Sequence, residues 1–175
     1  MNLNETKQLR LFFALWPNED IRDSLAQINH KLARQCLGKP MRPENLHITL
    51  AFPGNLPVTS LDYLLPMADA ISFKPFKLKL DYLGIFPRAH IIWAGMKTEP
   101  VELLELAAEL HTGILTCGFQ LDSQPFKPHL TLLRNAKRLP EQTIKPLYWK
   151  VDDYCLISSM SKPDGVQYKV LHRWS

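Results

Sequence analysis

Two short segments of this chain repeat each other in residue types that can do acid–base chemistry. The segments are His47-Ile48-Thr49-Leu50 and His129-Leu130-Thr131-Leu132, and they lie 82 residues apart. Given the six histidines of the chain and its threonine and leucine content, only about 0.05 His-x-Thr-Leu segments are expected by chance. Two copies therefore indicate a shared function rather than a coincidence of composition.

Each segment has the spacing that a β-strand needs to present its two polar side chains together. Residues i and i+2 of a strand project from the same face, so His47 would stand beside Thr49, and His129 beside Thr131. The aliphatic residues of both segments would enter the opposite, buried layer. Two such strands facing one groove would offer two imidazoles for proton transfer and two hydroxyls to bind a substrate oxygen.

The chemistry that this pair serves best is displacement at phosphorus. The ordinary pKa of histidine, ~6.5, allows one ring to be neutral and the other protonated near pH 7. One ring would deprotonate the attacking water, and the other would protonate the leaving oxygen. Such a mechanism needs no metal and no other cofactor.

Two other interpretations of the histidines are weaker. A single His-x-Thr on a strand is more typical of a structural histidine at a sheet surface, but two copies in the same context favour catalysis. A metal site needs three or four ligands at suitable spacing, and neither cysteine nor carboxylate accompanies these histidines.

The three cysteines, Cys36, Cys117 and Cys155, are odd in number and widely spaced, so we expect structural thiols.

Arg134 is a further candidate for the same site. It lies five residues after His129, so regular alternation would place it on the face opposite His129 and Thr131. It can reach a phosphate only if the strand ends, bulges or turns there, which Asn135 favours. Its guanidinium would then stabilise the charge of a pentacoordinate phosphorane. The alternative is an ordinary arginine in a basic surface segment.

The elements that must position these residues are strands and helices mixed along the whole chain, which predicts an α+β fold without a linker between domains. Strands are expected at residues 8–16, 46–52, 76–83, 91–96, 129–133, 148–158 and 168–174. Helices are expected from a cap at Asn18 to about Gly38, over residues 60–71 with Pro66 inside, and from a cap at Thr98 to Gly118. Pro53-Gly54 is expected to end the strand that carries the first motif.

Composition limits the class of protein. The chain has 175 residues, 46% hydrophobic and 22% charged, with a net charge of +4. These values are typical of one soluble domain over residues 1–175. The longest apolar run, residues 11–16, is far shorter than the ~20 residues that span a bilayer, and no secretory signal is evident. We therefore expect a cytoplasmic monomer with no membrane partner. The excess of basic over acidic residues favours an anionic binding partner.

The two motifs and their flanks resemble the 2H phosphoesterase superfamily, and most closely its bacterial and archaeal RNA 2',3'-cyclic phosphodiesterases, also called 2'-5' RNA ligases. The similar segments are residues 10–14, 43–52, 92–95 and 126–134. Pro53 departs from the aliphatic residue that is usual in this branch. The resemblance implies two similar lobes with antiparallel sheets around a central cleft that carries the two His-x-Thr-Leu strands.

The resemblance also implies residue roles. His129 would be the general base on water and His47 the general acid for the leaving ribose 3'-oxygen, an assignment that rests on the resemblance alone. Thr49 and Thr131 would bind the non-bridging phosphate oxygens. The substrate would be RNA or a nucleotide with a 2',3'-cyclic phosphate end, opened to a 2'-phosphate. The reverse reaction with a 5'-hydroxyl end would form a 2'-5' linkage.

Two alternatives remain open at this point. One is a non-catalytic RNA-binding module that uses the same basic cleft. The other keeps the chemistry but changes the substrate to ADP-ribose 1'',2''-cyclic phosphate or to 2'-5' oligonucleotides. Selectivity among such substrates would reside in loops such as residues 38–41 and 136–146.

Overall fold

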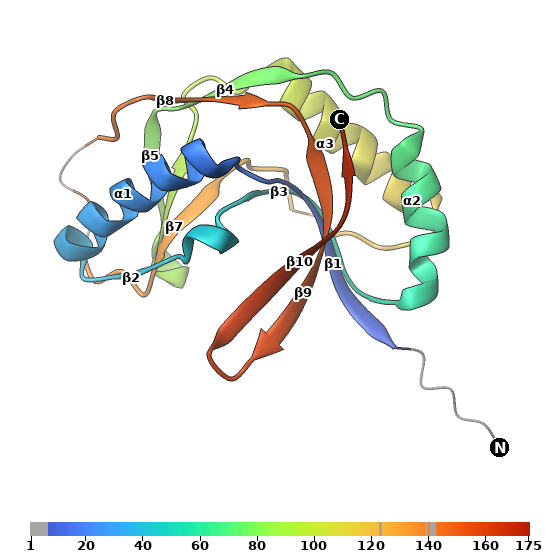
Figure 1. Cartoon of the computed structure of the whole chain (residues 1–175), viewed down its shortest axis with the longest axis horizontal. Coiled ribbons are helices and arrows are strands. Elements are labelled where there is room, and N and C mark those ends of the chain that lie inside the picture. The colour runs from blue at the N-terminus through green and yellow to red at the C-terminus, as the bar shows by residue number, and fades with distance from the viewer. Residues whose placement is uncertain (1–6, 123, 139, 141–142) are drawn as a thin grey trace.

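The computed structural model describes residues 7–122, 124–138, 140 and 143–175, and it has the α+β fold with antiparallel strands that the sequence predicts (Figure 1). The large sheet has the strands β1 (Gln8–Leu15), β2 (Lys39–Pro40), β3 (Ile48–Pro57), β5 (Tyr82–Phe86), β6 (Ile91–Gly95), β7 (Leu130–Arg134), β9 (Tyr154–Lys162) and β10 (Gly165–Trp174). Their order is β10-β9-β1-β3-β7-β6-β5, and β2 pairs with β7.

The large sheet divides into two halves that meet at the motif strands. One half contains β10, β9, β1 and β3, and the other contains β7, β6, β5 and β2. Within the described strands, the pairing of β3 with β7 is confined to Ile48 and Leu130. The two motifs therefore lie side by side where the halves join.

The helices cover different halves, as Figure 1 shows. Helix α1 (Glu19–Cys36) packs against β7 and β2, whereas α2 (Leu61–Asp69) packs on α3 (Val101–Thr116), which covers β3. A second sheet of β4 (Phe76–Leu80) and β8 (Leu147–Val151) arches over the top of the view. Single 3-10 turns occur at η1 (Pro43–Asn45), η2 (Val58–Ser60) and η3 (Pro87–Ala89). None of the helices in the described ranges is long and apolar enough to cross a membrane.

Helix α1 forms as the sequence predicts. The Asn18 side chain accepts a hydrogen bond from the Ile21 backbone N–H at 3.0 Å, which satisfies one of the free donors of the first turn. The apolar stripe that includes Leu25 and Leu32 is buried. The helix ends before Leu37, which has a φ of 50° in the left-handed region.

The strand that carries the first motif does not end at Pro53-Gly54, contrary to the prediction. It continues to Pro57 and pairs with β1 through register shifts. Gly54 has a φ of 83°, which glycine adopts at little cost. The Pro-Gly pair thus forms an irregularity within the strand instead of a turn that ends it.

Three other boundaries differ from the prediction. The expected strand over residues 76–83 is divided at the buried Asp81 into β4 and β5, which belong to different sheets. The Asp81 carboxylate accepts the Lys97 backbone N–H at 2.9 Å. The expected strand over residues 148–158 is also divided between the two sheets, into β8 of the small sheet and β9 of the large sheet. Helix α3 has Pro100 at its N-cap rather than Thr98.

Candidate active site

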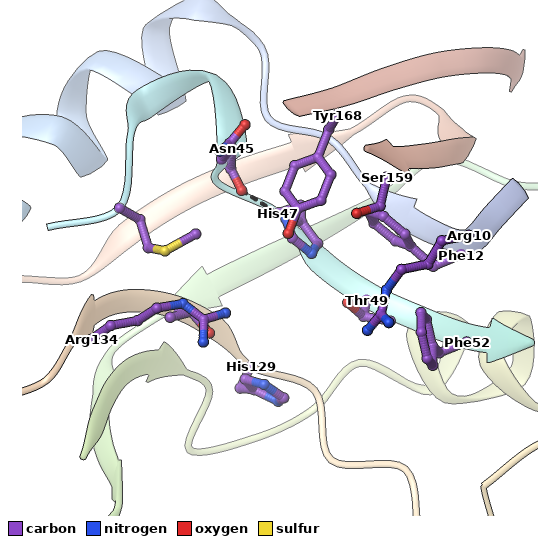
Figure 2. A pocket seen from close by; sticks show the side chains of 12 residues that line it. Arg10, Phe12, Asn45, His47, Thr49, Phe52, His129, Arg134, Ser159 and Tyr168 are labelled. Carbon is purple, nitrogen blue, oxygen red and sulfur yellow. Dashed lines mark hydrogen bonds between the residues drawn. The ribbon is translucent and has the colours of Figure 1, made fainter. Parts of the chain in front are cut away.

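A cavity of about 190 Å³ lies between the two motif strands (Figure 2). All five predicted site residues line it: His47, Thr49, His129, Thr131 and Arg134. The aliphatic residues between them, such as Ile48 and Leu130, are 0% exposed. The strand alternation therefore separates a polar face at the cavity from an apolar face in the core.

The two histidines have the same local hydrogen bond. Nδ1 of His47 donates to the carbonyl oxygen of Asn45 at 2.7 Å, and Nδ1 of His129 donates to that of Lys127 at 2.8 Å. Because a carbonyl can only accept, each Nδ1 must carry the hydrogen. In the neutral rings Nε2 then holds the free lone pair, so the same nitrogen of each ring is available for proton transfer.

Arg134 reaches the cavity because β7 bulges. Opposite β6, Ile92 pairs with Leu133 but Trp93 pairs with Thr131, so Leu132 is an extra residue. Leu132 and Leu133 are both buried, and this shifts the alternation so that the next side chain joins the polar face. Figure 2 shows the Arg134 guanidinium reaching toward the space between the two imidazoles.

Aromatic rings surround His47. Trp16 stacks on its ring at 5.6 Å between centroids, Phe12 lies at 5.0 Å, and Tyr168 meets it edge-on at 5.2 Å. This burial lowers the pKa of His47 to about 4, with smaller contributions from the charges of His129 and Arg134, while the Asn45 carbonyl acts in the opposite direction. Desolvation disfavours the charged imidazolium.

His129 has a similar but more open environment. Phe86 meets its ring edge-on at 5.0 Å, and Trp93 lies at 6.0 Å. Burial lowers the pKa of His129, and the nearby Lys127 ammonium lowers it further. Burial therefore favours the neutral form of both rings before substrate binds. The expectation of one neutral and one protonated ring applies only once an anion has entered and raised the pKa of one of them.

Several cavity residues were missed by the sequence reasoning, and each comes from a different element: Arg10, Asn45, Phe52, Ser159 and Tyr168. A signal existed for one of them. Phe52 lies five residues after His47, as Arg134 does after His129, and it follows two consecutive buried residues in the same way. The others lie outside the two His-x-Thr-Leu motifs. Arg10, whose guanidinium lies 4.8 Å from the centroid of the Phe52 ring, reaches the cavity only through strand pairing.

The remaining histidines do not line the cavity. His111 packs beneath β3, where its Nε2 is 3.1 Å from the carbonyl oxygen of Leu50, and His30 is exposed on α1. Over the described ranges, no group of three or more His, Cys, Asp or Glu side chains is placed to hold a metal ion. Two imidazoles, two hydroxyls and a guanidinium around one small cavity make up a site suited to acid–base chemistry on a phosphate ester.

Comparison with known proteins shows the family to which this chain belongs. The LigT-like phosphoesterase family model matches residues 15–93 and 96–168, and the chain belongs to this family. An Escherichia coli K12 protein named RNA 2',3'-cyclic phosphodiesterase is 32% identical, covering 95% of this chain and 96% of that protein. A protein of the same name from Archaeoglobus fulgidus is 33% identical, covering 93% of this chain and 98% of that protein.

Solved structures agree with this assignment. The crystal structure of Escherichia coli LigT in apo form has a TM-score of 0.86 and 31% identity, covering 96% of this chain and 97% of that chain. Its complex with 3'-AMP also has a TM-score of 0.86, with 32% identity and coverage of 96% and 98%. The MHV ns2 PDE domain, at 12% identity and a TM-score of 0.57, shares the fold.

Proposed function

We propose that this chain is an RNA 2',3'-cyclic phosphodiesterase that opens a terminal 2',3'-cyclic phosphate to a 2'-phosphate by metal-independent two-histidine catalysis. The observation that carries the proposal is the matched pair of Nδ1–carbonyl hydrogen bonds, which leaves both Nε2 atoms available at one cavity. The names of the relatives in Escherichia coli and Archaeoglobus fulgidus support it.

The proposed reaction is an in-line displacement at phosphorus. Water attacks the cyclic phosphate while Nε2 of His129 takes its proton, and the bond from phosphorus to the ribose 3'-oxygen breaks. Nε2 of His47 gives its proton to that oxygen. The hydroxyls of Thr49 and Thr131 bind the non-bridging oxygens, and Arg134 stabilises the charge of the phosphorane.

The lowered pKa of His47 has a consequence for this scheme. With a pKa of about 4, the ring is deprotonated in the free enzyme at pH 7, so it can act as the acid only after its pKa has risen. An anionic phosphate in the cavity raises it in two ways. The anion attracts the imidazolium directly, and it pairs with Arg134, whose charge otherwise disfavours protonation.

The experiment that tests the proposal is hydrolysis of cytidine 2',3'-cyclic phosphate in the presence of EDTA. Wild-type protein should form the 2'-phosphate, and His47→Ala or His129→Ala should lower turnover by ~10²-fold or more. His30→Ala, on the exposed face of α1, is the matched control and should leave turnover unchanged. Full activity in either cavity variant contradicts the mechanism, and activity abolished by EDTA indicates a metal.

The same assay separates the other substrates and functions. A panel of RNA ends, ADP-ribose 1'',2''-cyclic phosphate and 2'-5' oligonucleotides ranks them by kcat/KM. Binding of RNA with the cyclic end left intact identifies a binding module instead. Ligation is tested by adding RNA with a 5'-hydroxyl end. The proposal includes a single bilobal domain over residues 1–175 that acts as a monomer in the cytoplasm.

A further inference from the structure

A second hollow continues directly from the catalytic cavity. It has a volume of about 500 Å³ and shares six lining residues with the cavity: Arg10, Met41, Asn45, Arg134, Ser159 and Tyr168. Beyond them it runs between residues 39–42 and the tip of the β9–β10 hairpin. We call this hollow the hairpin groove. Figure 1 shows the hairpin extending away from the rest of the sheet.

The size of the catalytic cavity requires such an extension. Pockets that enclose a whole small ligand usually have volumes of about 300–1,000 Å³, whereas the cavity has about 190 Å³. By this comparison the cavity is too small to enclose a whole nucleotide. The rest of a substrate must leave the cavity, and the hairpin groove is continuous with it on the side of Arg134.

Two cations face each other at the start of the hairpin groove. Lys39 of β2 is directly opposite Arg134 of β7 in the strand register, and like charges in that position are destabilising. Gly38 allows this close approach, because a Cβ there would lie 3.3 Å from the Arg134 carbonyl oxygen. In the described part of the chain, neither cation forms an ion pair with a carboxylate.

A second pair of facing cations provides a comparison. Lys77 of β4 is opposite Lys150 of β8, but there Asp152 lies 2.8 Å from the Lys150 ammonium. The protein therefore compensates that pair with a carboxylate. Among the described residues, no carboxylate compensates Lys39 and Arg134 in this way.

The acidic residue at the hairpin groove does not compensate the charges of Lys39 and Arg134 either. Among the described lining residues the one carboxylate belongs to Asp164, and it is paired with Arg42 at 3.2 Å. The Asn45 amide also donates to the Val166 carbonyl oxygen at 3.0 Å. These contacts hold the hairpin beside η1 and leave the inner end of the groove cationic.

We infer that the hairpin groove binds the sugar–phosphate backbone of the nucleotides that precede the cyclic phosphate, with Lys39 contacting the penultimate phosphate. The preferred substrate is then a single-stranded oligoribonucleotide rather than a mononucleotide. This inference rests on the proposed function, because the position of the cyclic phosphate between the histidines defines which way the strand must run. Phosphate contacts of this kind supply affinity that falls with salt.

The test compares cytidine 2',3'-cyclic phosphate with a tetranucleotide that ends in the same group. In wild-type protein kcat/KM should be about tenfold or more higher for the tetranucleotide. Lys39→Gln should lower the tetranucleotide value about fivefold to tenfold, mainly through KM, and reduce the slope against log salt by about one. It should leave the mononucleotide value within about twofold. Lys77→Gln is the matched control and should change neither substrate.

Other outcomes overturn the inference. Equal loss on both substrates would mean that Lys39 acts on the catalytic cavity, and no loss on either would mean that the groove is unused. If neither substrate is hydrolysed, the proposed function fails, and fluorescence anisotropy with a tetranucleotide ending in a 2'-phosphate decides about the groove. Weaker binding by the Lys39→Gln variant supports the inference that the hairpin groove binds the RNA backbone. Equal binding by the variant and the wild type refutes that inference.

Discussion

At the scale of single residues, His47 and His129 have the same hydrogen bond but different surroundings. Three aromatic rings enclose His47, whereas His129 has two rings and the Lys127 ammonium nearby. Since desolvation is the largest influence on both, the surroundings determine how readily each ring takes a proton. Two copies of the same His-x-Thr-Leu motif can in this way supply two imidazoles of different acidity.

The half-buried His47, which is neutral in the folded protein at pH 7, makes stability depend on pH. Its pKa is about 4 when folded and ~6.5 when unfolded, so between these values the unfolded chain binds more protons. The unfolding free energy should therefore fall as pH is lowered from 6.5 to 4, by about 2 kcal/mol from this residue. Urea unfolding at pH 7.5 and pH 4.5 measures it.

His47→Gln is the variant that isolates this effect. It should lose less stability than wild type over the same pH range, whereas His30→Gln, at an exposed position, should match wild type. Equal losses in all three proteins would contradict the assignment of the acid sensitivity to His47.

Lys127 should tune the proton affinity of His129. Its Nζ lies 4.9 Å from the centroid of the Trp93 ring, and its charge contributes to the lowered pKa of His129. Lys127→Met removes the cation and should raise the pKa of His129, as measured by NMR titration of the imidazole. Lys127→Arg keeps the charge and should keep the pKa close to that of wild type. A Met variant with an unchanged pKa would show that burial alone sets it.

At the scale of elements, both motif strands have the same irregularity. In β3 the residues Leu50 and Ala51 are consecutively buried, as are Leu132 and Leu133 in β7. The fifth residue after each histidine, Phe52 or Arg134, therefore lines the cavity. The sequence showed the condition under which Arg134 could reach the site, but whether the strand bulges depends on its pairing with β6.

Two glycines make room for the ring that packs on His129. A Cβ at Gly84 would lie 2.0 Å from Cζ2 of Trp93, and one at Gly95 would lie 2.6 Å from Cζ3. Gly84→Ala should therefore displace the Trp93 ring, lower the unfolding free energy by about 1–3 kcal/mol, and reduce turnover because His129 moves with it. Thermal unfolding and the cyclic-phosphate assay check both effects.

A matched control for this prediction is Gly118→Ala. A Cβ at Gly118 meets nothing within 4 Å, so its φ of 84° is the one source of strain there. It should lower stability without lowering turnover. Unchanged activity in Gly84→Ala would mean that Trp93 does not position His129.

The elements that could be predicted from the sequence are those with local signals. Helix α1 has its cap and apolar stripe, and β1 and β7 have strongly apolar runs. The divisions at Asp81 and before β9 could not be predicted, because they arise where the chain passes from one sheet to the other. Asp81 remains buried there because the Lys97 backbone N–H and the Lys79 ammonium, at 3.1 Å, satisfy its carboxylate.

At the scale of the whole molecule, neither half of the sheet is a continuous piece of chain. Helix α1 follows β1 of one half but covers the other, and β9 and β10 return to pair beside β1. Each half depends on segments that pass through its neighbour. We therefore expect the two halves to fold together.

This interlocking predicts one cooperative unfolding transition. Helical circular dichroism reports on α1 and α3, which cover different halves, and the four tryptophans lie in both halves and in the small sheet. The two signals should give the same urea midpoint. A Trp93→Phe variant removes a fluorescence probe from the half that contains β5, β6 and β7. Its circular dichroism and fluorescence transitions should coincide as well. Separate midpoints would show that the halves unfold independently.

The net charge of +4 becomes informative only through its distribution. Four basic residues line the catalytic cavity and the hairpin groove: Arg10, Lys39, Arg42 and Arg134. The sequence motifs pointed to Arg134 alone. The other three lie outside the two His-x-Thr-Leu motifs, and the pairing of β1 with β3 and of β2 with β7 brings Arg10 and Lys39 to the site.

The matched hydrogen bonds of the two histidines affect what happens between turnovers. In the proposed reaction the base, His129, ends protonated at Nε2, and the acid, His47, ends without its proton. Each hydrolysis therefore exchanges the protonation states of the two histidines. Both rings keep Nδ1–H on a carbonyl throughout, so no ring has to flip. The product-bound site is then protonated for the reverse step, in which His47 takes the proton of the ribose 3'-hydroxyl. Exchange with solvent protons must restore a neutral His129 and a protonated His47 before the next hydrolysis, or before a 5'-hydroxyl can attack in place of water.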